Sequence, residues 1–411
     1  VAAASSGLSL DPNKENTHIV RTTSTVKDDH IGTVNGVKYF ARADGDSNRS
    51  FTVYSNAPLT GRYLGHAIKT IPNLQIANKE RDNCFTILYN DEKEKNTYLE
   101  NFYNTSLEIK HSYGDLSFEN PMKKGELSNN QNINYKNLIR NLHFEEILGN
   151  TSSGFTNIPS YLTVLDELLN KYIIDYKLLT KSALDFIKKG RFGSVLSSFY
   201  FRASIMNPYL VYSLNKTLLH GKKIFTPTLG WSSYAYWFLE CLDVEEYVGT
   251  DVIPSVCKKT EELCKQYRNV KSKIFCKPSE QLLKYKSFQN KYKNYFDVVF
   301  FSPPYFKLEK YKSKDQSIEN FENYEDWLEK YWKPTVELCN FVLQKNGTLC
   351  YIISDYGSEN IDGYYELVKD TKKYVREYFN KISVQSLLNK NVHVTKHRDT
   401  DEKIIICKKK N

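Results

Sequence analysis

The second half of the chain, residues 191–411, is predicted to fold as a doubly wound, mainly parallel α/β sheet of seven strands. Short apolar runs recur through this half and alternate with segments whose apolar residues have helical spacing. This alternation is typical of helices that cross over between parallel strands of one sheet. The last two runs lack such a helix between them, which predicts an antiparallel pair at the end of the sheet.

The seven expected strands follow one another in a regular order. They are the runs at 223–225, 247–249, 273–275, 297–301, 349–353, 383–388 and 403–407. Helical patterns fill the gaps, most clearly at 255–268, 323–344 and 364–380. In the second of these helices, Trp327 and Tyr331 are expected to pack on the sheet rather than to contact a ligand.

The first 190 residues have a different character and divide into three segments. Residues 1–35 are polar and aperiodic and are expected to form an extended arm. Residues 36–135 contain alternating runs such as 51–54, separated by Gly, Asn, Asp and Pro, and are expected to form a small β-rich domain. In residues 136–190, apolar residues recur at intervals of three and four, which predicts a helical connector.

The overall composition is that of a globular protein of two or three domains. The 411 residues are 40% hydrophobic and 26% charged, and no apolar stretch reaches the ~18 residues of a membrane helix. The net charge of +9 lies entirely in residues 191–411, which hold 35 Lys and Arg against 26 Asp and Glu. Such a balance suits a polyanionic partner, although a lysine-rich solvated surface gives the same count.

The eight cysteines indicate free thiols rather than disulfides or a metal site. None forms a CxxC pair or a Cys/His cluster with zinc spacing, so no metal is expected. Most lie in apolar surroundings, which is typical of buried thiols in a reducing compartment. We therefore expect an intracellular protein, of the cytoplasm or nucleus, and leave open whether a virus or phage encodes it.

The sharpest local signal is the tetrapeptide Ser302-Pro303-Pro304-Tyr305, which directly follows the apolar run 297–301. Open α/β sheets bind ligands at the carboxyl ends of their strands. Two prolines remove two N–H donors, the serine adds a hydroxyl acceptor and the tyrosine adds a flat face. The set suits an exocyclic amino group on a base, whereas an ordinary proline turn is the alternative. It resembles motif IV of the S-adenosylmethionine-dependent methyltransferases that modify adenine N6 or cytosine N4.

Upstream segments resemble the other motifs of that family, in the family's order. Thr226, Pro227, Gly230 and Trp231 follow the first strand and resemble the cofactor loop, motif I. The family has Asp or Asn where this chain has Thr226, and a second glycine where it has Ser232.

Two further segments complete the set of cofactor residues that the resemblance implies. Asp251 ends the second strand, where a carboxylate accepts hydrogen bonds from ribose hydroxyls; a helix N-cap is the alternative reading. Ser279 and Glu280 follow the third strand, and the segment that precedes the first strand resembles motif X. From that segment the implied cofactor contacts are Phe201, Asn207 and Pro208.

The resemblance covers about half of the chain and implies a Rossmann-like methyltransferase domain at 191–411. Its cofactor would be S-adenosyl-L-methionine and its substrate nucleic acid, with DNA favoured. Ser302 at the first motif IV position resembles the cytosine-N4 group more than the adenine-N6 group. An RNA amino-methyltransferase and an inactive, nucleic-acid-binding or structural relative remain alternatives. Residues 36–135 would then serve target recognition or assembly, and the oligomeric state stays open.

Overall fold

The computed structural model divides the chain into two compact units. One comprises 1–109, 148–152 and 156–202, and the other comprises 110–147, 153–155 and 203–411. The residues that the structure describes are 19–22, 29–34, 37–43, 51–55, 120–131, 134–153, 160–164, 173–175, 183, 195, 198, 200, 203–305, 309–311, 321–358, 363–389 and 398–411.

The first unit contains a five-stranded sheet in the order β2-β3-β4-β1-β6. Its strands are β1 (Ile19–Thr22), β2 (Asp29–Val34), β3 (Val37–Ala43), β4 (Phe51–Ser55) and β6 (Ile173–Asp175). All pairs are antiparallel except β1 with β6. Strands β3 and β4 lie within residues 36–135, for which a small β-rich domain was expected, and residues 56–119 of that segment lie outside the described residues. Within residues 1–35, expected to form an extended arm, the described residues are β1 and β2, which pair within this sheet.

The second unit is built on a seven-stranded sheet in the order β15-β16-β12-β10-β7-β8-β9. The strands are β7 (Lys223–Thr226), β8 (Glu246–Asp251), β9 (Lys271–Cys276), β10 (Phe296–Phe301), β12 (Leu343–Ile353), β15 (Phe379–Asn389) and β16 (Arg398–Lys409). β7, β8, β9, β10 and β12 pair in parallel, whereas β16 is antiparallel to both β12 and β15. This confirms the predicted Rossmann-like α/β class and its terminal antiparallel pair.

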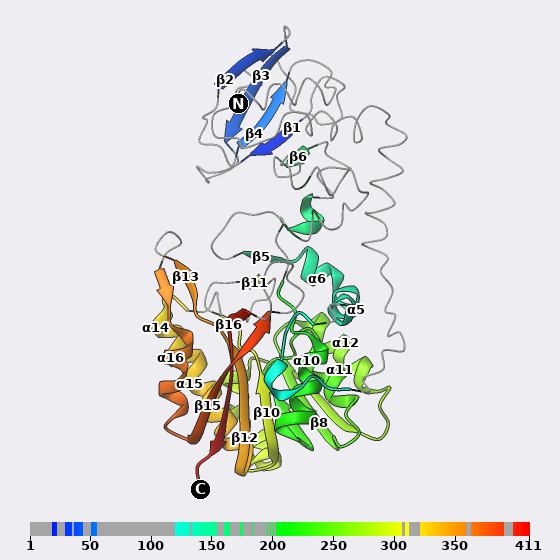
Figure 1. Cartoon of the computed structure of the whole chain (residues 1–411), viewed down its shortest axis with the longest axis vertical. Coiled ribbons are helices and arrows are strands. Elements are labelled where there is room, and N and C mark those ends of the chain that lie inside the picture. Colours follow the sequence, from blue (N-terminus) through cyan, green and yellow to red (C-terminus); the bar gives the residue numbers. More distant parts are fainter. Residues whose placement is uncertain are drawn as a thin grey trace. The chain divides into compact units, whose positions relative to one another are not determined.

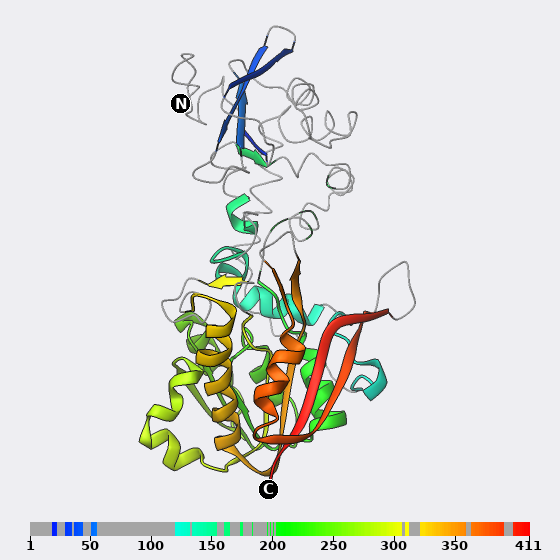
Figure 2. The same cartoon turned by 90° about the vertical axis from the view of Figure 1, so that its left-hand side faces the viewer.

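Helices cover both faces of this sheet (Figure 1). α10 (Pro208–Leu214), α11 (Ser233–Leu239) and α12 (Pro254–Cys264) lie on one face. On the other lie α14 (Tyr324–Trp327), α15 (Lys333–Val342) and α16 (Leu367–Val375), which face the viewer in Figure 2. The remaining α-helices and short strands are α5 (Asn134–Leu142), α6 (Phe144–Leu148), α13 (Lys286–Tyr292), β5 (Thr151–Ser153), β11 (Glu309–Tyr311), β13 (Tyr356–Ser358) and β14 (Gly363–Tyr365). Single turns of 3-10 or π-helix are η1 (Lys124–Glu126), η3 (Asn215–Leu219), η4 (Ser279–Lys284) and η5 (Leu328–Trp332).

The central strands are apolar because helices bury them on both sides. Val298 to Phe301 of β10 and Leu349 to Ile353 of β12 are all at most 1% exposed. The predicted helix at 364–380 is shorter than expected, since α16 ends at Val375 and β15 begins at Phe379. Six of the seven described cysteines are buried free thiols, as the sequence indicated. None of the helices in the described part of the chain has the length and apolar character that crossing a bilayer requires.

The segment at 120–147 belongs with the large sheet, whereas the sequence interpretation placed boundaries at 135 and 190. Tyr135 of α5 packs edge-on against Trp237 of α11, with ring centroids 5.4 Å apart. The Lys259 ammonium donates to the carbonyl of Leu142 at 2.8 Å. The apolar side of α5 is thus part of the core of this unit. Ile173–Asp175, expected within a helical connector, is instead strand β6.

Candidate functional site

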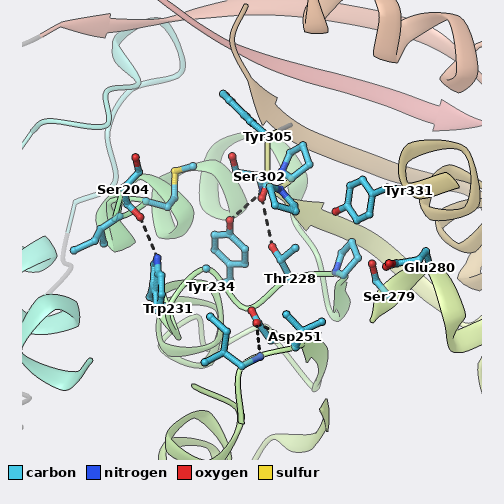
Figure 3. Close-up of a pocket in the computed structure, with 18 of the residues that line it drawn as sticks. Ser204, Thr228, Trp231, Tyr234, Asp251, Ser279, Glu280, Ser302, Tyr305 and Tyr331 are labelled. Atoms are coloured by element: carbon cyan, nitrogen blue, oxygen red, sulfur yellow. Dashed lines mark hydrogen bonds between the residues drawn. The ribbon is translucent and has the colours of Figure 1, made fainter. Parts of the chain in front are cut away.

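A pocket with a volume of about 300 Å³ opens at the carboxyl ends of β7, β8, β9 and β10. Its position is the one at which open α/β sheets bind ligands. Ten predicted site residues line it: Pro227, Gly230, Trp231, Asp251, Ser279, Glu280, Ser302, Pro303, Pro304 and Tyr305. Figure 3 shows Ser302 and Tyr305 at one end of this group and Asp251, Ser279 and Glu280 away from them.

Ser302 is held by three hydrogen bonds as it leaves β10. Its N–H donates to the Tyr234 hydroxyl at 3.0 Å, and its carbonyl accepts from the Thr228 hydroxyl at 3.4 Å. Its own hydroxyl donates to the Ile352 carbonyl on the neighbouring strand at 2.9 Å. Because that hydrogen is committed, the hydroxyl oxygen offers only lone pairs to a ligand. Pro303 and Pro304, which also line the pocket, have no N–H to donate to a ligand.

Tyr305 is fixed at both its hydroxyl and its ring. The hydroxyl accepts the Ser354 N–H at 2.7 Å and lies 3.2 Å from the Ser354 hydroxyl. The ring stacks on Tyr356 of β13, with centroids 5.4 Å apart and planes inclined by 24°. Burial raises the pKa of the Tyr305 phenol, so it stays neutral at physiological pH. The ring is thus a rigid, uncharged wall of the pocket.

The loop after β7 turns through three consecutive left-handed residues. Gly230, Trp231 and Ser232 have φ values of 53°, 58° and 67°. A Cβ on Gly230 would lie 2.4 Å from Cζ of Tyr234, so only glycine fits there. The Tyr234 hydroxyl in turn holds Ser302. Burial raises the pKa of Tyr234 to about 12. Gly230 therefore allows the contact that joins this loop to the tetrapeptide.

Buried hydrogen bonds hold the two non-glycine residues of this loop in the left-handed region. The Trp231 indole N–H donates to the Ser204 carbonyl at 3.1 Å. The Ser232 hydroxyl lies 2.8 Å from Nε2 of His143 and 2.6 Å from the Thr260 hydroxyl. A left-handed conformation costs a non-glycine residue ~1–2 kcal/mol. The surrounding side chains supply the bonds that offset this cost.

Asp251 at the end of β8 accepts three backbone N–H groups. Leu229 donates to Oδ2 at 3.1 Å, while Val252 and Ile253 donate to Oδ1 at 2.8 Å and 3.2 Å. Burial raises the pKa of the carboxyl, and the three N–H groups act in the opposite direction. The N-cap of α12 is Ile253 and makes no side-chain capping bond, so Asp251 is not the helix cap. It instead ties the loop after β7 to the end of β8.

Ser279 and Glu280 line the pocket beyond β9, as expected. The Thr250 hydroxyl of β8 donates to the Lys277 carbonyl at 2.6 Å and holds this turn beside Asp251. Tyr331 also lines the pocket, although it is only 2% exposed and was expected to belong to the core alone. The burial of Tyr331 and, to a lesser extent, the charge of Glu280 raise the pKa of the Tyr331 phenol.

Three predicted cofactor residues do not line the pocket, and a fourth lies outside the described residues. Thr226 is fully buried, with its hydroxyl 2.5 Å from that of Tyr247 in the core. Asn207 is the N-cap of α10: its side chain accepts the Tyr209 N–H at 3.0 Å. Pro208 occupies the first turn of that helix, where a proline is well tolerated. Phe201 is the residue that the structure does not describe.

The pocket also contains residues that the sequence interpretation did not name. Ser204, Ile205 and Met206 come from the predicted motif X segment, but from positions earlier than Asn207. Asn129 and Glu402 come from distant parts of the chain and carry no local signal. The others are Thr228, Tyr234, Val252, Ile253, Lys277 and Ser354. Among the described residues there is no cluster of three or more His, Cys, Asp or Glu suited to a metal ion.

No protein-family model matches the chain, and no curated protein matches its sequence. Solved structures resemble about half of it. TrmN from Thermus thermophilus is 10% identical, with a TM-score of 0.33 over 50% of this chain and 49% of its own. The N-methyltransferase NodS from Bradyrhizobium japonicum WM9, crystallised with S-adenosyl-L-homocysteine, is 7% identical with a TM-score of 0.32, covering 49% of this chain and 84% of NodS. A methyltransferase from Pyrococcus furiosus is 14% identical with a TM-score of 0.31, covering 50% and 84%. The chain thus spans about half the length of the TrmN structure.

Proposed function

We propose that this chain is an S-adenosyl-L-methionine-dependent methyltransferase that acts on the exocyclic amino group of a base in DNA, at cytosine N4 or adenine N6. The observation that carries the proposal is the state of Ser302. Its hydroxyl hydrogen is committed to Ile352, so at the pocket it offers an acceptor. An amino group is a donor that fits this arrangement, and the carboxylate of Asp251 lies in the same pocket.

The residues present fit the proposed cofactor. Gly230 lines the pocket with Pro227 and Trp231, and its missing Cβ makes room for the Tyr234 ring that holds Ser302. A carboxylate accepts about four hydrogen bonds, and three backbone N–H groups leave Asp251 room for a ribose hydroxyl. Ser279 and Glu280 would border the adenine. When bound, the cofactor supplies a methyl group on an electrophilic sulfonium centre.

The chain's own residues would orient the amino nitrogen. The Ser302 hydroxyl and the Pro303 carbonyl would each accept one amino hydrogen, which directs the nitrogen lone pair away from them. This is catalysis by positioning, and it needs neither a covalent nucleophile nor a metal. A base in a duplex must first leave the stack, at a cost of a few kcal/mol. Stacking on Tyr305 would offset ~1–3 kcal/mol of that cost.

Two measurements test the proposal. Isothermal titration of the purified chain with S-adenosyl-L-methionine should show saturable binding; no binding would refute any enzymatic role in methyl transfer. Mass spectrometry of nucleosides should then show N4-methylcytosine or N6-methyladenine after incubation with DNA and cofactor. Cytosine is the base expected first, and methylation of matched RNA but not DNA would refute the DNA assignment.

A variant of Ser302 separates its role from cofactor binding. Ser302→Ala should keep cofactor affinity within about twofold and lower methylation sharply, because it removes one acceptor for the amino group. Ser383→Ala removes an exposed hydroxyl on β15 that does not line the pocket, and serves as the matched control. Equal methylation by both variants would show that Ser302 does not hold the amino group.

A further inference from the structure

Tyr331 combines a place in the pocket wall with a buried hydroxyl that has no protein partner. Within the described part of the chain, no residue forms a hydrogen bond with this hydroxyl. The Thr335 hydroxyl lies nearby, but it donates its hydrogen to the Tyr331 carbonyl at 2.7 Å. Of the described residues whose buried side-chain polar atoms lack a hydrogen bond, Tyr331 is the one that lines the pocket. Such a group is uncommon in a folded protein because it lowers stability, so its position calls for an explanation.

The helix that carries Tyr331 widens at this point. α14, η5 and α15 follow one another without a break, and η5 is a π turn. Its bond joins the Lys333 N–H to the Leu328 carbonyl, five residues back. Pro334 comes next and has no N–H to give to the carbonyl four residues before it, which favours an irregular turn. π turns within helices are frequent at functional sites.

The π turn separates Tyr331 from the two tryptophans of the same helix. Trp327 and Trp332 are five residues apart and stack with ring centroids 6.3 Å apart and planes inclined by 9°. Trp332 also stacks on Phe301 of β10, with centroids 5.8 Å apart. The Tyr331 ring packs on Trp327 at 5.3 Å, and Figure 3 shows its hydroxyl turned inward, toward the other residues of the pocket. The tryptophans thus face the sheet, whereas the Tyr331 hydroxyl faces the pocket.

The neighbours of this hydroxyl indicate the kind of ligand that it fits. η5 lies beside η4, the turn that carries Ser279 and Glu280, and Figure 3 shows these three residues on one side of the pocket. A phenol with an ordinary pKa of about 10 keeps its hydrogen at neutral pH, and burial raises the pKa of Tyr331 further. It can therefore donate one hydrogen bond, whereas a carboxylate such as that of Glu280 only accepts. Adenine offers the matching pair on one edge, an amino group beside a ring nitrogen.

We propose that Tyr331 binds the adenine of S-adenosyl-L-methionine by donating its hydroxyl hydrogen to the ring nitrogen beside the amino group, N1 or N7. Glu280 would accept a hydrogen of that amino group. The inference rests on the proposed function and adds a cofactor-binding residue from outside the predicted motifs. It explains the buried hydroxyl, because the cofactor would supply the acceptor that the protein does not.

Tyr331→Phe separates this role from a structural one through two measurements. Removal of a buried hydroxyl that lacks a partner should leave the melting temperature of the cofactor-free chain unchanged or raise it. In calorimetry the same variant should bind S-adenosyl-L-methionine roughly three- to tenfold more weakly, the value of one hydrogen bond.

Tyr351→Phe is the matched control. Tyr351 is fully buried on β12 outside the pocket, and its hydroxyl lies 3.1 Å from that of Thr371. Loss of this bond should lower the melting temperature and leave cofactor affinity unchanged, which is the opposite pattern.

Cofactor analogues test the contact with the ring nitrogen. The probes are S-adenosyl-L-homocysteine and its 1-deaza, 3-deaza and 7-deaza analogues, each with a CH group in place of one ring nitrogen. The wild-type chain should bind either the 1-deaza or the 7-deaza analogue roughly three- to tenfold more weakly than the parent. It should bind the 3-deaza analogue like the parent, since N3 lies on another edge. Tyr331→Phe should no longer distinguish the weaker analogue from the parent.

Two results would overturn the inference. A lower melting temperature of cofactor-free Tyr331→Phe with unchanged cofactor affinity would show that the hydroxyl is structural. The same pattern of analogue affinities in wild type and variant, including no discrimination at all, would show that Tyr331 does not contact the ring nitrogen. In both cases the wild-type chain still binds the cofactor, so the proposed function stands. No cofactor binding by the wild-type chain would refute the proposed function itself, and this inference with it.

Discussion

Replacing Gly230 with alanine should destabilise the unit that holds the pocket by about 2–5 kcal/mol. The figure combines two costs. The φ of 53° is left-handed, which costs an alanine ~1–2 kcal/mol. The added Cβ would also meet the Tyr234 ring at 2.4–2.8 Å, and overpacking of this kind costs ~1–3 kcal/mol. Displacement of Tyr234 would further loosen its bond to the Ser302 N–H, so methylation should fall as well.

Chemical denaturation followed by tryptophan fluorescence measures this change. All four tryptophans, at positions 231, 237, 327 and 332, belong to the unit concerned. Gly125→Ala is the matched control, because its Cβ would meet no atom within 4 Å. In the double variant Gly230→Ala/Tyr234→Ala the clash is absent but the backbone cost remains. Its loss of stability should therefore be smaller than the sum of the losses in the two single variants. A Gly230→Ala variant within about 0.5 kcal/mol of wild type would refute the reasoning, since that is the ordinary scatter of harmless substitutions.

Three further results are expected. Tyr305→Ala should lower kcat/KM by roughly 5- to 150-fold through lost stacking. Tyr305→Phe should keep most activity and lose about 0.5–1.5 kcal/mol of stability, because the Ser354 N–H loses its acceptor. Methylation assays and melting curves measure both effects, and equal losses of activity in the two variants would show that Tyr305 has only a structural role. Asp251→Ala should weaken S-adenosyl-L-methionine binding by ~1.5–3 kcal/mol in calorimetry, the value of a charged hydrogen bond. A lower melting temperature with unchanged affinity would show that Asp251 only holds the backbone and does not contact the cofactor. Burial raises the pKa of Glu402 above 4.5 in the folded chain. The stability of the wild type relative to Glu402→Gln should therefore fall as pH rises from about 4.5 through the folded pKa, and then level off. A difference in melting temperature between the two that does not vary with pH would contradict the raised pKa.

The large sheet could be predicted because its signals are local. Each central strand is a continuous apolar run, as expected for strands that helices bury on both sides, and each run matched a strand. The tetrapeptide at Ser302 could be placed for the same reason, since it follows such a run directly. Asp251 followed from its place at the end of the second strand. All three inferences depend only on residues within a few positions of one another.

The rest of the site depends on contacts between distant residues, which no local pattern reports. Thr226 follows the first strand as the motif requires, but its hydroxyl bonds to Tyr247 on the neighbouring strand. The Asn207 side chain accepts the Tyr209 N–H in the first turn of α10, and the Asn207 N–H donates to the side chain of Asn129, 78 positions earlier in the chain. Glu402 reaches the pocket only because β16 pairs beside β12. The direction of a side chain and its partner across the sheet are properties of the fold.

Residues 147 and 203, which flank the stretch 148–202, are neighbours in space. The Ala203 N–H donates to the Ile147 carbonyl at 3.1 Å, so the chain leaves the pocket-bearing unit and returns to it at adjacent points. A segment spliced in at such a point puts little constraint on its host, because the host backbone is already continuous in space. A short Gly/Ser link from Ile147 to Ala203 should therefore retain the pocket, while it would remove residues 153–155 of this unit and β6, which pairs with β1 in the other unit.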